Sequence, residues 1–535
     1  MHKPLLGFLT AFLILAGLSI IPDDSSFRAQ QEQTQLRHEV KVTVKLIQVY
    51  VTDKKGNPVL DLTKDDFLIY DEGQKKPITE FERHVLSLPS GAEDAQLEVK
   101  ETPPLPYREL LPRKFFLFFD FAYNNGIGIE KSRKAALHFI DTQLQPQDEV
   151  GVLSYSAIKS LKLHEYLTTD HQKVREVAGK FRLEQIAGRA EDFEAGYWQA
   201  VTGENPKDAS RSGAVDNRTD VPTLRPDRKE SENQTLQFAQ KMIDLSKALR
   251  YIPGHKHIVL FSSGVPYSIV YGNQSPYGIS DLGNPGLRFK YEDMLRELSA
   301  ANCTIYALDT QELTQILDRG TSMQGRYTLE KMAGATGGKY FGNINNYERH
   351  IEKIQDLTGC YYVLGYYVDD KWDGAYHKIK VEVSRPGCKV QAQKGYFNPK
   401  PFTEYSDLER TLHLVDLALS EEPLFQTPVR FPLAILPYSP DGKGNLCLAA
   451  EIPLDKIQEV LAGKVEIITV VFDEKENIVT LKREQRRKTE FAGDNFSYVA
   501  SFSLSPGLYK CRLVIRNLET GKGAVASATA VIPSR

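Results

Sequence analysis

The chain has 535 residues, with 41% hydrophobic residues, 26% charged residues and a formal net charge of −3 at pH 7. This length is too great for a single hydrophobic core and predicts roughly three or four domains in a chain that folds. The net charge lacks the strong basic excess of nucleic-acid binders, so we expect no nucleic-acid partner.

The N-terminus has the layout of an export signal. A short basic start at His2 and Lys3 precedes an apolar run from Leu5 to Ile21, and an acidic and polar segment follows it. An uncleaved anchor is the alternative, because roughly 17 apolar residues are at the lower limit for spanning a bilayer. We therefore expect a signal peptide or anchor over residues 1–30. The protein would then be periplasmic, in the cell envelope or secreted, and would touch a membrane only through this segment.

The next segment, residues 38–85, has the pattern of a small β module. EVKVTVKLIQVYVTD alternates apolar and polar residues, DKKGNP has turn chemistry, and FLIYDEGQKKPITEF gives two more short strands. Residues 86–112 are rich in Pro and acidic residues, which predicts a linker.

Between residues 113 and 358, apolar strands alternate with segments of helical spacing. The strands read FFLFF, VGVLSY, HIVLFSS and CTIYALD. Because they are apolar throughout, we expect them to be buried on both faces, in a mainly parallel, doubly wound sheet covered by helices. An interruption at about 201–234 lacks aromatic residues and periodicity, and it is expected to be a mobile surface insertion.

After residue 358 the pattern returns to β. Residues 359–398 are expected to complete the N-terminal β module, so that the α/β domain is inserted into it. Residues 408–535 begin with a short helical segment and continue as regularly spaced strands, which predicts an antiparallel sandwich of immunoglobulin-like type. The expected fold class is therefore multi-domain α/β plus β.

Five cysteines permit at most two disulfides and leave one thiol over. Cys360 and Cys388 flank a predicted hairpin, and Cys447 and Cys511 lie in late strands, so these are the two candidate pairings. Cys303 begins an apolar strand and is expected to pack as a small hydrophobic side chain. The histidines do not cluster with cysteines or carboxylates at the spacing of a zinc site.

Several segments follow one another in the order typical of a known family. They read FFLFFDFAYNNG, PQDEVGVLSYS, LRYIPGHKHIVLFSSGVP, CTIYALDT and MAGATGGKYF. This set resembles the von Willebrand factor type A domain. The flanking VYVTDKKGNPVLDLTKDDFLIYDEG and YYVLGYYVDDKWDGAYHKIKVEVSRPG resemble the bacterial exported "VWFA-related domain" proteins in particular. The resemblance covers roughly residues 38–397.

The resemblance implies a metal-ion-dependent adhesion site at the carboxyl edge of the sheet, where hydroxyl and carboxylate oxygens bind Mg²⁺ or another divalent cation. Asp120 matches the first ligand of the family pattern, but Ala122 cannot ligate. Glu191 or Asp192 replaces a Thr ligand, and the SSG at 262–264 has no second carboxylate. The implied site is therefore degraded. Its candidate ligands are Asp120, Asn124, Asp192, Ser262 and Ser263.

Asp120 also has a purely structural interpretation. A buried carboxylate must find hydrogen-bond donors or become neutral. Backbone N–H groups of residues 122–126 and the hydroxyls of Ser262 and Ser263 are the available donors. On this interpretation, Asp120 fixes the loop that follows the first strand of the sheet.

The functional hypothesis is a non-catalytic, exported protein that binds another protein, with no cofactor required. SSG at 262–264 lacks the GxSxG context of a serine nucleophile. The alternatives are a metal-dependent adhesin with a variant ligand set, an envelope hydrolase with its chemistry after residue 400, and edge-to-edge assembly of the C-terminal sandwich.

Overall fold

The computed structural model describes residues 42–85, 112–181 except 158, 188–202, 228–272, 283–311, 323–438 except 370 and 372, 445–487 and 494–533. The predicted signal or anchor over 1–30 lies outside these residues, as do most of the linker 86–112 and most of the insertion 201–234. Among the described helices, none is both long enough and apolar enough to span a membrane.

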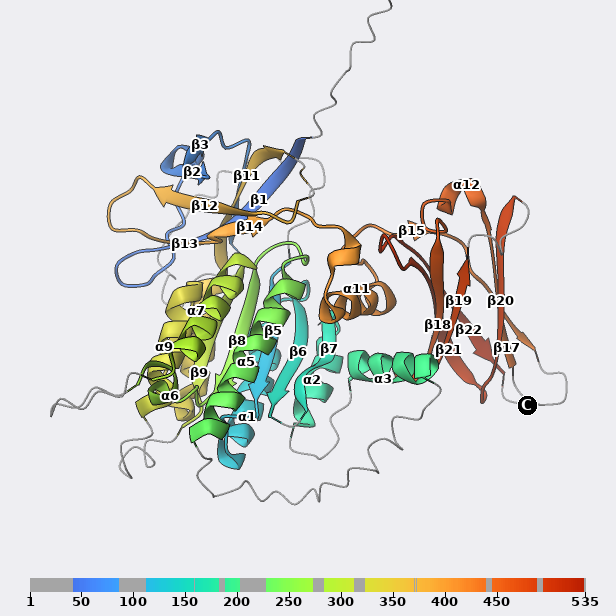
Figure 1. The fold of residues 1–535 in the computed structure, drawn as a ribbon, viewed down its shortest axis with the longest axis horizontal. Coiled ribbons are helices and arrows are strands. Elements are labelled where there is room, and N and C mark those ends of the chain that lie inside the picture. The colour runs from blue at the N-terminus through green and yellow to red at the C-terminus, as the bar shows by residue number, and fades with distance from the viewer. Residues whose placement is uncertain are drawn as a thin grey trace, which may run out of the picture. The chain divides into compact units, whose positions relative to one another are not determined.

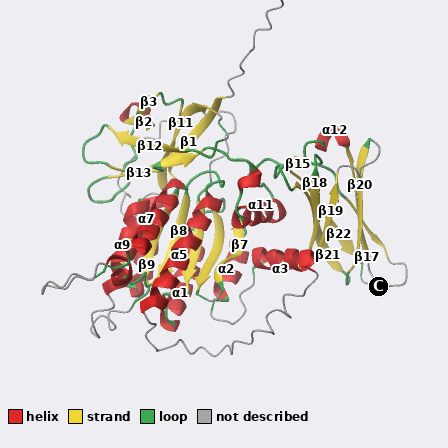
Figure 2. Ribbon diagram, in the orientation of Figure 1, coloured by secondary structure: helices red, strands yellow, loops and turns green. Residues whose placement is uncertain are grey.

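Two four-stranded sheets form a β module at the N-terminal end of the described chain (Figures 1 and 2). In order across the first sheet, the strands are β13 (Lys389–Ala392), β1 (Val42–Thr52), β11 (Cys360–Asp369) and β4 (Glu80–Val85). The second sheet contains, in order, β14 (Gly395–Phe397), β12 (Tyr376–Val383), β2 (Phe67–Asp71) and β3 (Gln74–Lys76). Strands from before residue 86 thus pair with strands from after residue 359.

The core of this β module follows from the alternation of its strands. β1 pairs antiparallel with β11, with Val49 opposite Tyr362, and Ile47, Ile69 and Leu364 are fully buried in the shared core. Glu72 and Gly73 make the two-residue turn between β2 and β3, and both have positive φ, at 50° and 77°. Positive φ at both positions is the requirement of a type I′ hairpin turn.

A six-stranded sheet forms the centre of the second part of the chain (Figure 1). In order across the sheet, the strands are β10 (Lys339–Phe341), β9 (Cys303–Asp309), β8 (Lys256–Ser262), β5 (Lys114–Asp120), β6 (Glu149–Ser156) and β7 (Ser160–Thr168). All neighbouring pairs are parallel except β6 and β7. The prediction of a mainly parallel sheet is confirmed. Read from β7 to β10, the strand order is that of a doubly wound fold.

Helices cover both faces of this sheet. One face packs against α5 (Arg228–Leu249), α7 (Pro285–Ala300) and α9 (Met323–Thr336). The other packs against α1 (Gly126–Thr142), α2 (His171–Gly179) and α10 (Tyr347–Thr358). β5, β8 and β9 are buried along their whole length, as the two-sided cover requires. α3 (Arg189–Thr202) packs along the edge strand β7, and the short α6 (Tyr267–Tyr271) follows β8.

The C-terminal part contains two sheets around one core. The larger sheet contains, in order, β15 (Val429–Arg430), β22 (Gly523–Ile532), β21 (Gly507–Asn517), β18 (Lys464–Phe472) and β19 (Ile478–Arg487). The smaller sheet contains β16 (Ala434–Tyr438), β17 (Asn445–Pro453) and β20 (Asn495–Ser503). Helix α11 (Asp407–Leu419) precedes these strands in the chain. The single helical turn α12 (Leu454–Ile457) lies between β17 and β18. This region is rich in strands, as the sequence predicts.

Neither predicted disulfide is formed, and all five cysteines are free thiols. Cys360 begins β11 and Cys388 directly precedes β13, and these strands lie on either side of β1, which places about two strand spacings between the cysteines, farther than a disulfide can reach. Cys447 lies in the smaller sheet of the sandwich, between the core residues Leu446 and Leu448, so its side chain points away from the core. Cys511 points into that core from the other sheet.

Candidate functional site

The candidate site lies at the carboxyl edge of the six-stranded sheet. β5 ends at Asp120, and its neighbour β8 ends at Ser262. The strand order reverses between these two strands, because the chain passes outward from β5 to β7 before it returns to β8. Such a switch point is where open α/β sheets bind their ligands.

Asp120 is only 1% exposed and is held by three donors. Its Oδ1 accepts hydrogen bonds from the backbone N–H groups of Ala122 at 2.9 Å and Tyr123 at 3.2 Å. Its Oδ2 accepts a short bond from the hydroxyl of Ser262, which in turn accepts from the N–H of Gly264 at 2.9 Å. The sequence-predicted pair of Asp120 and Ser262 is therefore brought together.

Burial raises the pKa of the Asp120 carboxyl to about 6, and the hydrogen bonds from Ser262, Tyr123 and Ala122 offset only part of this rise. Desolvation destabilises the charged form of a carboxyl group, while hydrogen bonds to the carboxylate stabilise it. Asp120 is consequently close to its titration range at neutral pH.

A second chain of hydrogen bonds joins two more of the candidate ligands, Asn124 and Ser263, through Thr310. The Thr310 hydroxyl donates to Asn124 Oδ1 at 2.6 Å, and the Ser263 hydroxyl lies 3.0 Å from Thr310 Oγ1. Because the Thr310 proton is given to Asn124, Ser263 is the donor to Thr310. The sequence analysis did not single out Thr310, although its position directly after β9 was the available signal.

Asp309, the last residue of β9, is also at this edge and is buried. Its carboxylate accepts from the Tyr340 hydroxyl at 2.7 Å and from the N–H of Gln311 at 3.0 Å. Burial raises the pKa of Asp309, and the two hydrogen bonds, which lower it, offset only part of this rise. Both oxygens of Asp309 are thus engaged by donors of its own surroundings.

Close backbone contact fixes the loop after β8. Gly264 has φ +78°, which favours glycine, and a Cβ there would lie 2.2 Å from the carbonyl oxygen of Gly325. A Cβ on Gly325 would meet the carbonyl oxygen of Ser263 at 1.9 Å. The two glycines let α9 approach the loop that carries Ser262 and Ser263.

Asp192 does not join this site, which corrects its assignment as a candidate ligand. It lies in the first turn of α3, and the neighbouring Arg189 and Glu191 bond to β7, through Glu165 at 3.0 Å and His164 at 2.8 Å. These bonds hold the start of α3 against the middle of the edge strand, away from the carboxyl end of β5. Sequence order placed Asp192 between the other candidate ligands, but the contacts of α3 decide its position.

The same contact includes a hydrogen-bonded Ser–His–Glu chain. Ser154 Oγ lies 2.7 Å from His164 Nε2, and His164 Nδ1 lies 2.8 Å from Glu191 Oε2. These are the residue types of a nucleophilic triad. However, Ser154 is buried within β6, with Phe119 of β5 and Lys162 of β7 as its partners in the two ladders. The backbone N–H groups around Ser154 are used in hydrogen bonds to β5 and β7. These N–H groups are therefore not free to form an oxyanion hole.

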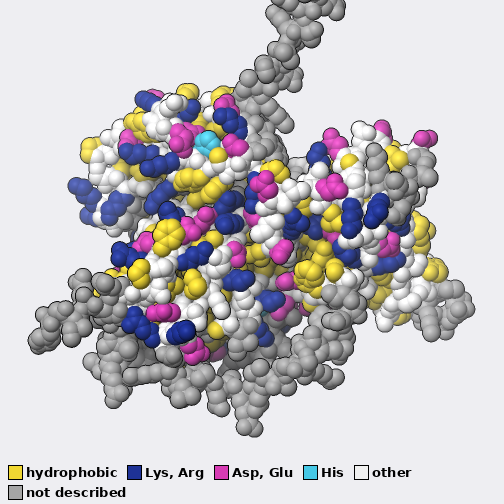
Figure 3. Space-filling view, in the orientation of Figure 1, with side chains coloured by type: hydrophobic (Ala, Val, Ile, Leu, Met, Phe, Trp, Pro, Cys, Tyr) yellow, Lys and Arg dark blue, Asp and Glu magenta, His cyan; other side chains and the backbone are white. Residues whose placement is uncertain are grey.

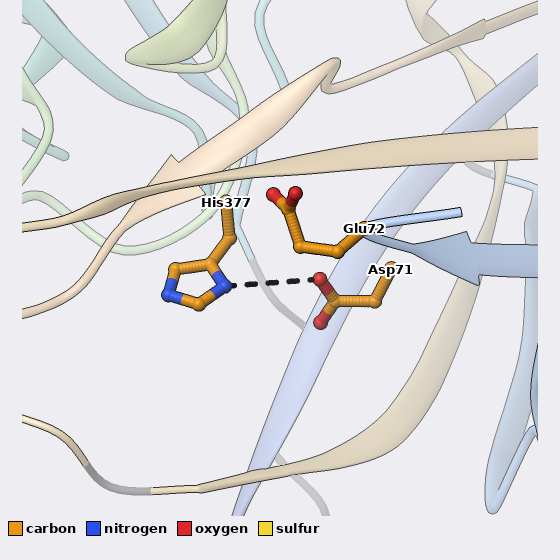
Figure 4. Close-up of side chains that lie close together, drawn as sticks. All are labelled: Asp71, Glu72 and His377. Carbon is orange, nitrogen blue, oxygen red and sulfur yellow. Dashed lines mark ion pairs between the residues drawn. The ribbon is translucent and has the colours of Figure 1, made fainter. Parts of the chain in front are cut away.

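One cluster with metal-ligand residue types lies in the β module, among the described residues (Figure 4). Asp71 and Glu72, at the end of β2, and His377, in β12, point toward one another, with one ligand atom of each within 4.8 Å of the others. His377 Nδ1 is 3.9 Å from Asp71 Oδ1, while Asp71 Oδ2 accepts from the hydroxyls of Tyr366 and Tyr396 at 3.0 and 3.2 Å.

The hydrogen bonds of His377 argue against a metal centre in this cluster. Asn398 Nδ2 donates to Asp373 at 2.8 Å, which fixes the orientation of its amide, and it also lies 3.0 Å from His377 Nε2. Nε2 therefore accepts, and the proton of the neutral ring is on Nδ1, the nitrogen that faces Asp71. A nitrogen that carries a proton cannot ligate a metal. We assign the cluster to packing of the two sheets.

No protein-family model matches the chain, and no curated protein matches it. Among solved structures, it is similar to an aerotolerance-related membrane protein from Bacteroides fragilis NCTC 9343, at 10% identity over 46% of this chain and 98% of that one, with a TM-score of 0.23.

The conserved hypothetical protein BatB from Bacteroides thetaiotaomicron gives 9% identity over the same shares, 46% and 98%, also with a TM-score of 0.23. A glycosyl hydrolase family 2 member from Bacteroides cellulosilyticus DSM 14838 covers 34% of this chain and 21% of its own length, at 10% identity and a TM-score of 0.17. TM-scores at this level support no conclusion about fold or function.

Proposed function

We propose that this chain is an exported, non-catalytic protein-binding protein whose α/β domain is of type A, and that its contact surface is the carboxyl edge of the six-stranded sheet. The observation that carries the proposal is the convergence of Asp120, Asn124, Ser262, Ser263 and Thr310 at the switch point of the strand order. The β module and the C-terminal sandwich, which we assign to the immunoglobulin-like type, then act as spacer and platform.

Aromatic side chains beside this edge support a protein partner. Tyr267 of α6 stacks on Tyr271, with ring centroids 4.8 Å apart, and its ring is 5.6 Å from that of Tyr327 on α9. Tyr327 is 51% exposed. Tyrosine is enriched at protein interfaces and among the residues that carry most of the binding energy. Tyr267 comes three residues after Gly264 in the sequence, and Tyr327 comes two residues after Gly325, so both rings lie next to the loop that these glycines fix.

The residues at this edge do not fit a divalent cation. A hard cation takes six or more oxygen ligands, which include waters and usually one or more carboxylates. Here Asp120 is bonded to three donors, Asn124 Oδ1 accepts from Thr310, and Asp309 accepts from Tyr340 and Gln311. The side-chain oxygens are thus satisfied by one another, which favours metal-free binding over metal-dependent adhesion.

The alternative of a hydrolase with its chemistry after residue 400 has less support. His413 is the one histidine in that part of the sequence. It is buried on α11 beside Phe402 and Phe425, and burial lowers its pKa to about 3. A neutral imidazole enclosed by aromatic rings is poorly placed to exchange protons with a substrate.

Site-specific photocrosslinking tests the proposal. A photoreactive phenylalanine analogue replaces Tyr327 at the proposed surface, and a matched control replaces Tyr367 of β11, which is exposed to a similar degree, at 53% against 51%. In envelope fractions of the producing cell, we expect one crosslinked adduct from position 327 and none from position 367. Excess purified wild-type protein should suppress the adduct, whereas the N124A/T310V variant should not.

Equal crosslinking from both positions, or no adduct from position 327, would refute a binding surface at this edge. Crosslinking that requires added Mg²⁺ would instead favour the metal-dependent version.

A further inference from the structure

Each sheet has two edge strands, and natural proteins protect such edges against pairing with another chain. The edge strands β3, β10, β13, β14 and β15 are only two to four residues long. β4 and β19 carry charged side chains, β16 contains Pro437, and α3 packs along β7. Figure 3 shows Lys and Arg side chains gathered at the surface where β19 runs in Figure 1. Among the described strands, every edge except that of β20 thus has a feature that discourages strand addition.

β20 has none of these features. It is a strand of nine residues, NFSYVASFS, without charge, proline or register shift. It pairs with β17 on one side, and no other described strand pairs with it. Exposed and buried residues alternate strictly along its length, so the strand is regular from end to end. Its free edge therefore presents a row of backbone N–H and C=O groups to another chain.

The sequence of β20 is nearly the same in both directions about Val499. When two copies pair antiparallel at Val499, that residue lies opposite itself. In this register, Phe496 lies opposite Phe502 of the other copy. Ser497 lies opposite Ser501 in the same way. Pairs of aromatic residues and pairs of hydroxyl residues stabilise neighbouring strands, so β20 is complementary to a second copy of itself.

The outward face at the centre of this pairing is apolar. Val499 is 62% exposed and lies opposite Ala449 of β17, which lies opposite Ala434 of β16. A two-fold axis places identical residues near one another, so a charged residue at the centre would meet its own like charge. β20 has no charged residue. The chemistry of this edge therefore fits a second copy of the chain.

We propose that the protein forms a two-fold symmetric dimer, in which β20 pairs antiparallel with β20 of a second copy and Val499 lies on the axis. The two sheets that contain β16, β17 and β20 then join into one continuous sheet. An isologous interface of this kind uses the same surface on both copies, so the assembly closes at two. The interface lies in the C-terminal sandwich and does not depend on the proposed binding function.

Sedimentation velocity of the full chain tests the proposal. We expect the wild type to have twice the 60.4 kDa mass of the chain. V499K and V499E should each associate at least about tenfold more weakly, because two like charges lie opposite each other. An equal mixture of V499K and V499E should recover the dimer. L436K is the matched control: Leu436 is 61% exposed on the same face of the sheet but belongs to β16, so this variant should remain dimeric.

Cysteine crosslinking tests the register, in a background where the half-buried Cys388 and Cys447 are replaced by serine. Opposite residues of an antiparallel pair have Cα atoms about 4.5–5.5 Å apart, which a disulfide can bridge. V499C should therefore link two copies when oxidised by copper phenanthroline in air. S497C should not link on its own, because it lies opposite Ser501, whereas S497C/S501C should link.

The proposal is overturned if the wild type sediments as a monomer up to its highest soluble concentration, or if V499K associates like the wild type. It is equally overturned if L436K dissociates the dimer as fully as V499K does. Crosslinking of S497C as readily as V499C would also overturn it.

Discussion

The two ends of strand β5 hold buried charge in opposite ways. At the amino end, the guanidinium of Arg113 and the carboxylate of Asp148 form a two-point ion pair with no exposed side-chain surface, and Arg113 also donates to Gln355 at 2.8 Å. At the carboxyl end, Asp120 has only hydroxyl and backbone dipoles. The charge at the amino end is therefore compensated by an opposite charge, whereas the charge at the carboxyl end is stabilised by dipoles alone.

The largest expected effect is at the amino end. Replacing Asp148 with Asn leaves the Arg113 charge buried without a counterion, which should lower the free energy of unfolding by about 3–5 kcal/mol. Urea denaturation followed by circular dichroism measures the loss. A loss of unfolding free energy below about 1 kcal/mol would show that the Arg113–Asp148 ion pair does not stabilise this end of the strand.

The opposite sign is expected for Asp120→Asn. The pKa of Asp120 is about 6 in the folded protein against an ordinary value of 3.8, so the folded state binds the proton more tightly than the unfolded state. Wild-type stability from this group is therefore present below pH 4 and is lost as pH rises toward 6. The neutral amide avoids that loss, and the variant should gain up to about 3 kcal/mol at pH 8.

Melting curves at pH 8 and pH 4 check the Asp120→Asn prediction, because most of the gain should be lost at the lower pH. The exposed Asp141, which pairs with Arg175, gives a matched control: Asp141→Asn should change stability by less than about 0.5 kcal/mol at both pH values. Destabilisation of Asp120→Asn at pH 8 would mean that the charge is compensated in the folded protein.

A smaller effect should separate the two serines of the SSG turn. Ser262 donates to the carboxylate of Asp120, whereas Ser263 donates to the neutral hydroxyl of Thr310. Ser262→Ala should cost about 2 kcal/mol at pH 8 and less at pH 4, where Asp120 is protonated in the folded protein. Ser263→Ala should cost about 1 kcal/mol at both pH values. Chemical denaturation of both variants tests the difference; equal pH dependence would contradict it.

The elements of the fold were largely predictable from the sequence. Strands such as FFLFF and HIVLFSS are apolar throughout because both faces of the sheet are covered, and this pattern is visible without coordinates. β7 was missed because its run SLKLHEYLT is polar: it is an antiparallel edge strand, and His164 and Glu165 bond to α3. The domain boundaries remain predictions.

The candidate site was predictable only in part. Asp120 and Ser262 end adjacent parallel strands, so their proximity follows from the pattern of the sheet. Asp192 could not be placed in this way, because its position depends on how a helix packs against the edge of the sheet and not on the end of a strand. The disulfide prediction was wrong because the sequence does not show which strands are neighbours in a sheet.

The most direct test of the account is a divalent-cation titration of the melting temperature at pH 8, on wild type and Asp120→Asn. We predict that Mg²⁺, Mn²⁺ and Ca²⁺ at about 5 mM shift both proteins equally, because the side-chain oxygens at the carboxyl edge bond to one another. Binding at a hundredfold excess over the dissociation constant would stabilise the folded state by about 2.7 kcal/mol. A rise of several degrees in wild type alone would contradict a metal-free edge.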